Sequence, residues 1–164
     1  MAKKDAAKSK AKGEPDGIHV VARNRRARFE FDLIEKVEAG LVLTGTEVKS
    51  LRTGKASLEE AYASVDRDEV WLYGCDIPEY LQANRLNHKP KRPRKLLLHR
   101  GEIDKLSSKS SEKGLTLVPL AIYFKKGMAK VELCVARGRK LYDKREALKK
   151  QDAKREIDRA LRRR

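Results

Sequence analysis

Positive charge is concentrated at the two ends of this chain, and that distribution decides which part can fold around a core. The chain has 164 residues and a net charge of +16. Residues 1–28 contain nine Lys or Arg against three acidic residues, and residues 137–164 contain thirteen against five. The stretch between them has eighteen basic and sixteen acidic residues, so it is nearly neutral. The sequence therefore predicts a folded body with two cationic arms. Their natural ligand is a polyanion, because each Lys or Arg placed on a phosphate releases counterions.

The length suggests one domain with tails, since about 100 to 200 residues per domain is usual. We predict a body over residues 17–136 and a disordered basic arm over 1–16, which is rich in Lys and Ala and has no aromatic residue. No run is long and apolar enough to span a bilayer, and the start lacks the apolar segment of a secretory signal. Cys75 and Cys134 have no metal-ligand spacing, so we expect buried thiols in a cytoplasmic protein.

The body begins with a pattern of period two. Charged and apolar side chains alternate over residues 28–33, which predicts a half-buried strand that continues to residue 38. Ala39 and Gly40 are interpreted as a turn, and residues 41–43 as the returning strand. The sequence therefore predicts a long hairpin here.

Short strands paired as hairpins dominate the rest of the body. Pro78, Pro90 and Pro93 lie among polar residues in a predicted long exposed loop over 77–95. The other expected elements are a helix over 46–52 that Thr46 caps and Gly54 ends, strands over 58–65 and 70–73, a helix over 101–113, and strands over 115–124 and 128–136. Such a pattern predicts a mainly β, small antiparallel barrel with a few short helices. The oligonucleotide-binding (OB) fold is one member of that class, although strand count alone does not select it.

The predicted long loop and the strand after it form a local positive patch. Between residues 85 and 100 there are seven basic residues and no acid: Arg85, Lys89, Lys91, Arg92, Arg94, Lys95 and Arg100. Prolines stiffen the loop, so fewer conformations are lost when it docks on a ligand. We interpret the patch as a nucleic-acid surface; the alternative is an ordinary solvated surface.

The C-terminal arm, residues 137–164, is rich in Ala, Leu, Lys, Arg and Glu, all good helix formers. Glu146 with Lys150 and Asp158 with Arg162 are favourably oriented i,i+4 pairs. The apolar stripe of this helix is thin, so it has little to bury against a barrel. We predict an arm that is disordered when free and helical along nucleic acid when bound. A basic solubilising tail is the alternative.

No catalytic or metal-binding pattern is found. Gly54-Lys55 resembles the end of a phosphate-binding loop, but Lys49 and Ala56 stand where that motif needs Gly and Ser or Thr. His19, His88 and His99 show no metal-like spacing, and no G-x-S-x-G elbow is present. We therefore predict a protein that is not an enzyme and that holds no metal or cofactor.

Six strings, in order along the chain, resemble one family closely: the small protein B (SmpB) family, the SsrA-binding proteins of bacterial trans-translation. The first three strings are Asn24-Arg25-Arg26-Ala27-Arg28, Glu38-Ala39-Gly40-Leu41 and Gly45-Thr46-Glu47-Val48-Lys49-Ser50-Leu51-Arg52. The others are Gly54-Lys55-Ala56, Arg94-Lys95-Leu96-Leu97-Leu98-His99 and Gly138-Arg139-Lys140-Leu141-Tyr142-Asp143-Lys144-Arg145. Any one string is weak evidence, whereas six in order are specific.

The resemblance implies an OB-fold barrel with a central helix and an RNA-binding adaptor function. Such an adaptor binds the tRNA-like domain of tmRNA (SsrA RNA). With elongation factor Tu and GTP, it brings alanyl-tmRNA to a ribosome stalled without a stop codon. Its C-terminal tail would lie as a helix in the empty mRNA channel near the decoding centre and sense that vacancy. Nothing argues against a monomer.

The resemblance also implies site residues. The tmRNA contacts of the family fall on Glu38, Leu97 and His99, and the matching strings add Arg26, Arg28, Arg94 and Lys95. The ribosome-acting motif falls on Gly138, Asp143, Lys144 and Arg145, with Tyr142 where some relatives have His; Lys149, Lys150, Lys154 and Arg155 match in character as phosphate contacts. Without the family, Glu38 is equally a strand-end carboxylate facing water, and Leu97 an ordinary core residue.

Two other classes of protein compete with this interpretation. A structural ribosomal protein would share the barrel, the basic arms and the pI of about 10, but would have no reason to contain the string over residues 138–145. An enzyme acting on RNA would need an acid–base or metal constellation, and the sequence shows none.

Overall fold

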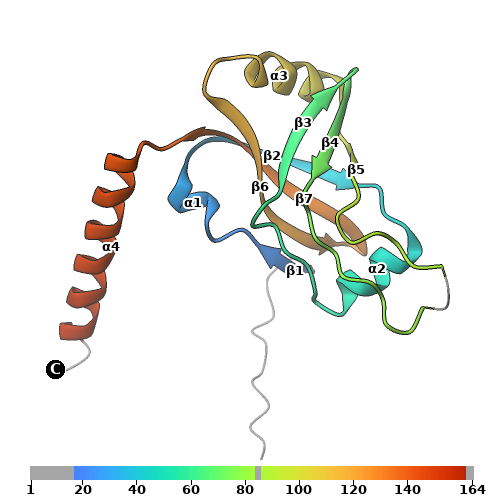
Figure 1. The fold of residues 1–164 in the computed structure, drawn as a ribbon, viewed down its shortest axis with the longest axis horizontal. Helices are drawn as coiled ribbons and strands as arrows, with labels where there is room; N and C mark the ends of the chain where they lie inside the picture. Colours follow the sequence, from blue (N-terminus) through green and yellow to red (C-terminus); the bar gives the residue numbers. More distant parts are fainter. Residues whose placement is uncertain (1–16, 84–85, 162–164) are drawn as a thin grey trace, which may run out of the picture.

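The computed structural model describes residues 17–83 and 86–161, which form a sheet closed on itself with helices at its rim (Figure 1). The described strands are β1 (Ile18–Arg23), β2 (Phe31–Leu41), β3 (Tyr62–Asp66), β4 (Glu69–Tyr73), β5 (Arg94–Leu97), β6 (Leu115–Lys125) and β7 (Met128–Gly138). The described helices are α1 (Ala27–Glu30), α2 (Gly45–Arg52), α3 (Arg100–Ser110) and α4 (Leu141–Leu161). The predicted mainly β fold with few short helices is confirmed.

All described strand pairings are antiparallel. The sheet order is β1-β6-β3-β4-β5-β2-β7, and β7 also pairs with β6, which closes the sheet into a ring. One edge of β6 pairs with β7; the other pairs first with β3, at Leu117, and then with β1. This ring is consistent with the OB-like fold that the resemblance implies.

Two of the predicted hairpins form where local turn chemistry favours them. β3 and β4 are joined across Arg67 (φ 46°) and Asp68 (φ 64°), and β6 and β7 across Lys126 (φ 51°) and Gly127 (φ 78°). Positive φ at both central residues is the two-residue turn whose twist matches that of the flanking strands.

The hairpin predicted around Ala39 and Gly40 is wrong. β2 runs without a break through both residues, because Gly40 pairs with Leu97 of β5 on one edge and with Lys130 of β7 on the other. Pairing on both edges uses the backbone groups that a turn would leave exposed. Tertiary pairing therefore overrides the local turn signal of Ala-Gly.

The beginning of the body also differs from the prediction. Residues 27–30 are the short helix α1 rather than the start of a strand, because the Ala27 N–H donates to the Asn24 side-chain oxygen (3.0 Å) and Ala27 is buried. The strand β1 was not predicted. Its apolar residues cover the outer edge of β6 rather than alternate cleanly between core and solvent.

The cap of α2 lies two residues earlier than predicted. The Thr44 N–H donates to the Glu47 carboxylate over 2.8 Å in a capping box, so Thr44 precedes the helix as its cap. Thr46 lies inside the helix, and its hydroxyl is 3.0 Å from Nδ1 of His88. The predicted ending holds, with Gly54 at φ 78° beyond the last turn.

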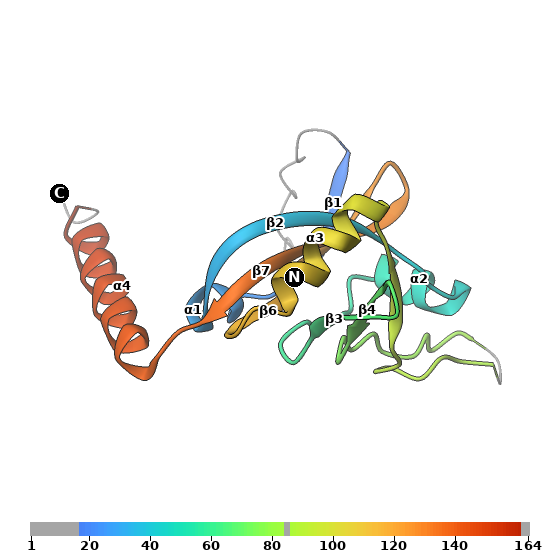
Figure 2. The same cartoon turned by 90° about the horizontal axis from the view of Figure 1, so that it is seen from above.

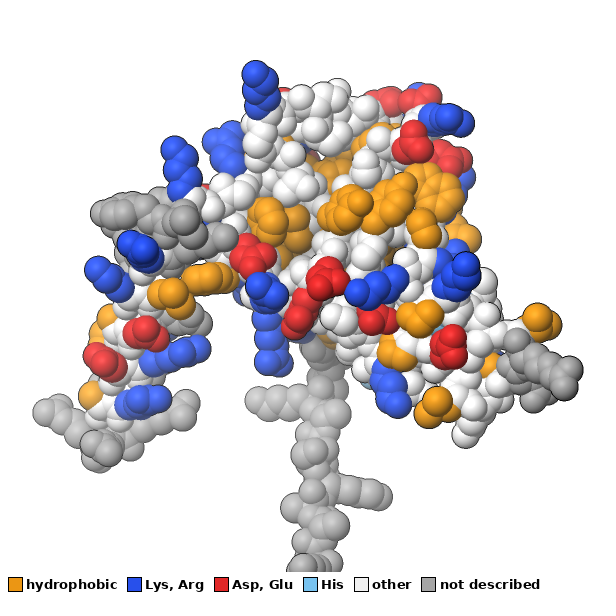
Figure 3. Space-filling model, viewed as in Figure 1, with side chains coloured by type: hydrophobic (Ala, Val, Ile, Leu, Met, Phe, Trp, Pro, Cys, Tyr) orange, Lys and Arg blue, Asp and Glu red, His pale blue; other side chains and the backbone are white. Residues whose placement is uncertain are grey.

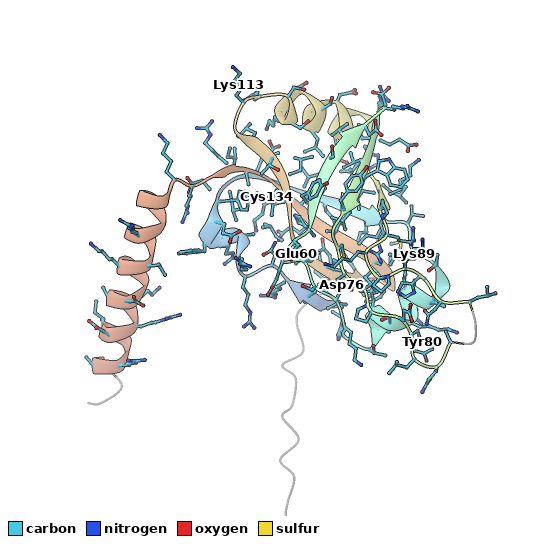
Figure 4. All side chains as sticks on the ribbon, in the orientation of Figure 1. Glu60, Asp76, Tyr80, Lys89, Lys113 and Cys134 are labelled. Atoms are coloured by element: carbon cyan, nitrogen blue, oxygen red, sulfur yellow. The ribbon has the colours of Figure 1, made fainter. Side chains whose placement is uncertain are left out.

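The core fills the inside of the ring. It includes the fully buried Leu51 of α2, together with Leu72, Ile122 and Leu133 of the strands. Cys75 and Cys134 are buried, as predicted, and Figure 4 places Cys134 within the sheet. Burial raises the pKa of the Cys75 thiol to about 11, which keeps it protonated and unreactive.

The helix α4 stands apart from the ring, and Figures 1 and 2 show it beyond the end of β7. β7 continues to Gly138, so the first two residues of the predicted tail, Arg137 and Gly138, belong to the sheet. The predicted arm over residues 1–16 lies outside the described residues, as do residues 162–164 of the tail.

Candidate RNA-binding surface

Glu38 is the centre of a polar cluster on the outer face of β2. The Tyr123 hydroxyl donates to its Oε2 over 2.5 Å. Lys125 Nζ is 3.2 Å from the same oxygen, and Lys130 Nζ is 3.2 Å from Oε1. The hydrogen bond from Tyr123, supported by the two lysines, lowers the pKa of Glu38 to about 2. The carboxylate is therefore ionised at neutral pH and holds one phenol and two ammonium groups in place.

Leu97 lies beside this cluster. It is 54 % exposed and pairs with Gly40, which follows Glu38 by two residues and so faces the same side of β2. A Cβ at position 40 would lie 3.3 Å from the Leu97 Cβ, so the glycine leaves room for the leucine to lie over β2. Leu97 is thus an exposed apolar side chain and not part of the core.

His99 is exposed at the start of α3, two residues beyond Leu97. Its backbone N–H donates to the Glu102 carboxylate over 3.0 Å, which closes a capping box and fixes the turn that presents the imidazole. The closure of the ring therefore brings Glu38, Leu97 and His99 to one region of the outer surface. This is the arrangement that their predicted common role requires.

A groove of about 820 Å³ continues from this region across β1, β6 and β7. Among the residues that line it are Arg23, Arg25, Arg28, Asn24, Tyr123 and Glu132. Tyr123 belongs both to the groove and to the Glu38 cluster, so the two form one continuous surface. Several arginines beside a hollow of this size favour a phosphate backbone as ligand.

Asn24 fixes the backbone that presents those arginines. Its N–H donates to the Leu120 carbonyl over 2.8 Å, and its side-chain amide donates to the Leu58 carbonyl over 3.0 Å. The side-chain oxygen accepts the Ala27 N–H, so the backbone and side chain of Asn24 together bond to three segments. The segment with the exposed Arg25, Arg26 and Arg28 is therefore held in place before a ligand arrives; Arg26 also pairs with Glu30 at 3.0 Å.

Arg94 is placed differently from the other predicted contacts. Its side chain is fully buried and donates to Glu47 Oε1 (2.9 Å), the Cys75 carbonyl (2.6 Å) and the Pro90 carbonyl (2.8 Å). A guanidinium with no exposed surface cannot contact RNA in this conformation. We therefore assign Arg94 a structural role and leave it out of the proposed RNA-contacting set.

Glu47, the partner of Arg94, is also fully buried. Burial by itself raises the pKa of a carboxyl group, but hydrogen bonds from Arg92 and the Thr44 N–H and the charge of Arg94 outweigh it and hold the pKa of Glu47 below its ordinary value. Arg92 binds both carboxylate oxygens, at 2.7 and 2.6 Å. Arg92 and Arg94, two of the seven basic residues in the predicted patch, thus form ion pairs with a buried carboxylate.

The long loop between β4 and β5 is tied down at several points. Asn87 accepts the Tyr80 N–H at 3.2 Å and donates to the Tyr80 carbonyl at 3.0 Å, and the buried His88 ring lies 2.9 Å from the Ile77 carbonyl. Lys89 remains exposed on this loop, near α2 in Figure 4. Lys91 pairs with Glu60 at 2.9 Å. Arg85 lies outside the described residues.

Lys95 of β5 is half-exposed, faces outward and pairs with Glu69 of β4. In the tail, Gly138 ends β7 and pairs with Phe31. The described side chains of Arg145, Lys149, Lys154 and Arg155 are exposed along α4. Side chains of Tyr142, Asp143, Lys144 and Lys150 are outside the description, although α4 includes their backbone.

Sequence reasoning missed Tyr123, Lys125 and Lys130 as members of the surface. All three occupy outward positions of the long hairpin β6–β7, so the alternation of that hairpin already marked them as surface residues. What the alternation could not show is that they face Glu38, from which Tyr123 is 85 residues away in the chain.

Among the described residues, no group of three or more His, Cys, Asp or Glu could hold a metal ion. No described helix has the length and apolar character that crossing a bilayer requires.

The chain is similar to known proteins along nearly its whole length. The family model described as "SmpB protein" matches residues 21–163. The chain belongs to the SmpB protein family. Among family members, the SsrA-binding protein of Thermobifida fusca is 54 % identical over 158 residues, covering 96 % of this chain and 99 % of that protein. The SsrA-binding protein of Beijerinckia indica is 58 % identical over 151 residues, covering 91 % of this chain and 96 % of that protein.

A solved structure agrees with this membership. It is described as "tmRNA-SmpB: a journey to the center of the bacterial ribosome", and one of its chains is 46 % identical with a TM-score of 0.65, covering 77 % of this chain and 93 % of that chain. The family resemblance that the six strings carry is therefore confirmed, and with it the fold expected for an SmpB protein.

Proposed function

We propose that this SmpB family member is the RNA-binding adaptor of trans-translation. It binds the tRNA-like domain of tmRNA and delivers it to stalled ribosomes, where nascent chains are tagged and the ribosomes are rescued. The observation that carries this proposal is the meeting of Glu38, Leu97 and His99 on one outer surface that continues into an arginine-lined groove. The names of the relatives, SsrA-binding proteins, support the same RNA as ligand.

The surface combines two kinds of recognition. The exposed Arg25, Arg26 and Arg28, together with Lys125 and Lys130, supply phosphate contacts, which give affinity independent of sequence. Glu38 and His99 supply hydrogen-bonding groups for base edges, and Leu97 offers an apolar contact. A folded RNA whose backbone and bases fit both sets at once is selected over other polyanions.

The tail is proposed to act on the ribosome rather than on tmRNA. It begins at Gly138, where β7 ends, so its basic helix can reach rRNA while the ring binds tmRNA. The residues proposed for the mRNA channel and decoding centre are Gly138, Tyr142, Asp143, Lys144, Arg145, Lys149, Lys150, Lys154 and Arg155. The complex delivered is alanyl-tmRNA with elongation factor Tu and GTP, and the protein acts as a cytoplasmic monomer without catalysis of its own.

The test is a gel-shift titration of tmRNA with bulk tRNA as competitor at two salt concentrations. We expect tight binding that survives excess tRNA and raised salt, because specific contacts add to counterion release. Binding that tRNA competes away and salt abolishes would contradict the proposal. It would favour a ribosomal protein with basic extensions instead.

A further inference from the structure

Three aromatic side chains lie together on the outer face of β3 and β4, away from the Glu38 cluster. Tyr62 and Tyr73 are directly opposite each other, and their rings stack with centroids 5.4 Å apart and planes 20° apart. Trp71 precedes Tyr73 by two residues and so faces the same side. Tyr62 is 51 % exposed, and the other two are partly exposed. Figure 3 shows hydrophobic side chains gathered over this part of the molecule.

These rings are not needed for the core. The alternate residues Ala63, Val70 and Leu72 point inward and are at least 95 % buried, so they close this side of the ring by themselves. A group of exposed aromatic side chains on a small protein marks a binding surface more often than chance exposure does. Neither the core nor the groove includes these three residues.

The charges around the rings are paired within the protein. Lys95, opposite Trp71, pairs with Glu69, and Arg100 lies 3.3 Å from Asp68 at the tip of the hairpin. The rings of this aromatic strip, Tyr62, Trp71 and Tyr73, therefore offer uncharged π faces, whereas the groove is lined by several arginines. The ligand that suits such faces is a flat ring with little charge, and unpaired nucleobases stack on sheet aromatics in this way.

The strip is continuous with the surface proposed to bind RNA. Lys95 of β5 lies opposite Trp71 of β4. Leu97 is two residues further along β5 and so faces the same side. An RNA strand seated at Leu97 and His99 can therefore extend onto the aromatic rings across the Lys95–Glu69 ion pair, whose two charges offset each other.

We propose that Tyr62, Trp71 and Tyr73 form a stacking platform for unpaired bases of the RNA that the Leu97 and His99 surface binds. This inference rests on the proposed function and extends its contact surface to β3 and β4. The platform occupies only two strands and is bordered by exposed ion pairs. A stable protein partner would bury about 800 Å² on each side, so the strip suits single bases better than a protein.

The protein contains its own probe, because Trp71 is the only tryptophan in the chain. Stacking of a base on an indole quenches its fluorescence. The experiment titrates the full-length protein with a transcript of the tmRNA tRNA-like domain, following Trp71 fluorescence and gel shift in parallel. We expect quenching that saturates together with the gel shift. A complete gel shift with unchanged Trp71 fluorescence would contradict the stacking platform and would favour a protein as the ligand of this face. Absence of a gel shift would contradict the proposed function itself.

Two variants of Tyr62 test whether RNA binding depends on the aromatic ring at this position. Tyr62→Leu removes the ring but keeps an apolar side chain, and we expect about tenfold weaker binding, the scale of one lost base stack. Tyr62→Phe keeps the ring and is the matched control, with affinity expected to be unchanged. Thermal unfolding of both variants checks that the ring of strands stays intact. Equal affinity of the two variants would contradict the proposal.

Discussion

At the scale of single residues, the surface depends on one carboxylate. Glu38 holds Tyr123 by a 2.5 Å hydrogen bond and lies 3.2 Å from Lys125 and Lys130. Replacing it by Ala removes both the proposed base contact and the anchor of three neighbours. We expect Glu38→Ala to weaken tmRNA binding by about 1–3 kcal/mol, the scale of a specific base contact.

The hydrogen bond between Tyr123 and Glu38 should couple the effects of substitutions at these two positions. In a double-mutant cycle, Glu38→Ala and Tyr123→Phe should cost less together than the sum of their separate effects on tmRNA affinity, because the second change removes a contact already lost. Gel shift measures all four proteins. Glu112→Gln, an exposed carboxylate in the turn between α3 and β6, serves as a control away from the groove. Unchanged affinity in Glu38→Ala would remove Glu38 from the interface.

Substitution of Arg94 should lower the stability of the protein, whereas substitution of Arg28 should weaken RNA binding. Arg94→Leu leaves the buried Glu47 carboxylate with Arg92 as its remaining side-chain partner, so we expect a loss of about 3–5 kcal/mol in the free energy of unfolding. The exposed Arg28→Ala should change stability little and weaken RNA binding instead. Urea unfolding and gel shift on both variants separate the two roles; an Arg94→Leu protein of normal stability and weak binding would contradict this assignment.

At the level of elements, we propose that the ring binds tmRNA and the tail acts on the ribosome. Replacing Asp143, Lys144 and Arg145 together changes only the first turns of α4, which follows the sheet at Leu141. We expect near-normal tmRNA affinity and no tagging of nascent chains, measured by gel shift and by a tagging assay on stalled ribosomes. A charge-preserving variant, Lys144→Arg, is the control. A large loss of tmRNA binding in the triple variant would contradict this assignment of roles to the ring and the tail.

The elements also show which signals in the sequence were sufficient. The hairpins β3–β4 and β6–β7 follow from alternation on either side of a short turn, and both are local properties. β2 was interpreted wrongly because Gly40 has partners on two other strands, which no local window contains. α1 was missed for the same reason, since Asn24 is held by the Leu58 and Leu120 carbonyls.

In the whole molecule, the two parts that we propose to bind RNA are joined end to end. The ring presents the Glu38 surface and its groove, and α4 stands beyond β7 with its own basic side chains (Figure 2). Because α4 extends away from the ring, one RNA can occupy the ring while another binds the tail. The adaptor function proposed for this SmpB protein needs this separation.

The neutral body between basic arms, the mainly β class, the buried cysteines and the family are predictable from the sequence, because composition, alternation and short strings are local. Three features depend on the folded ring: the common surface of Glu38, Leu97 and His99, the buried position of Arg94, and the exposure of Tyr62, Trp71 and Tyr73. Closure of the ring sets these positions, since it pairs strands distant in the chain. A basic residue beside a buried carboxylate folds inward, whereas the same residue type without such a partner stays in water.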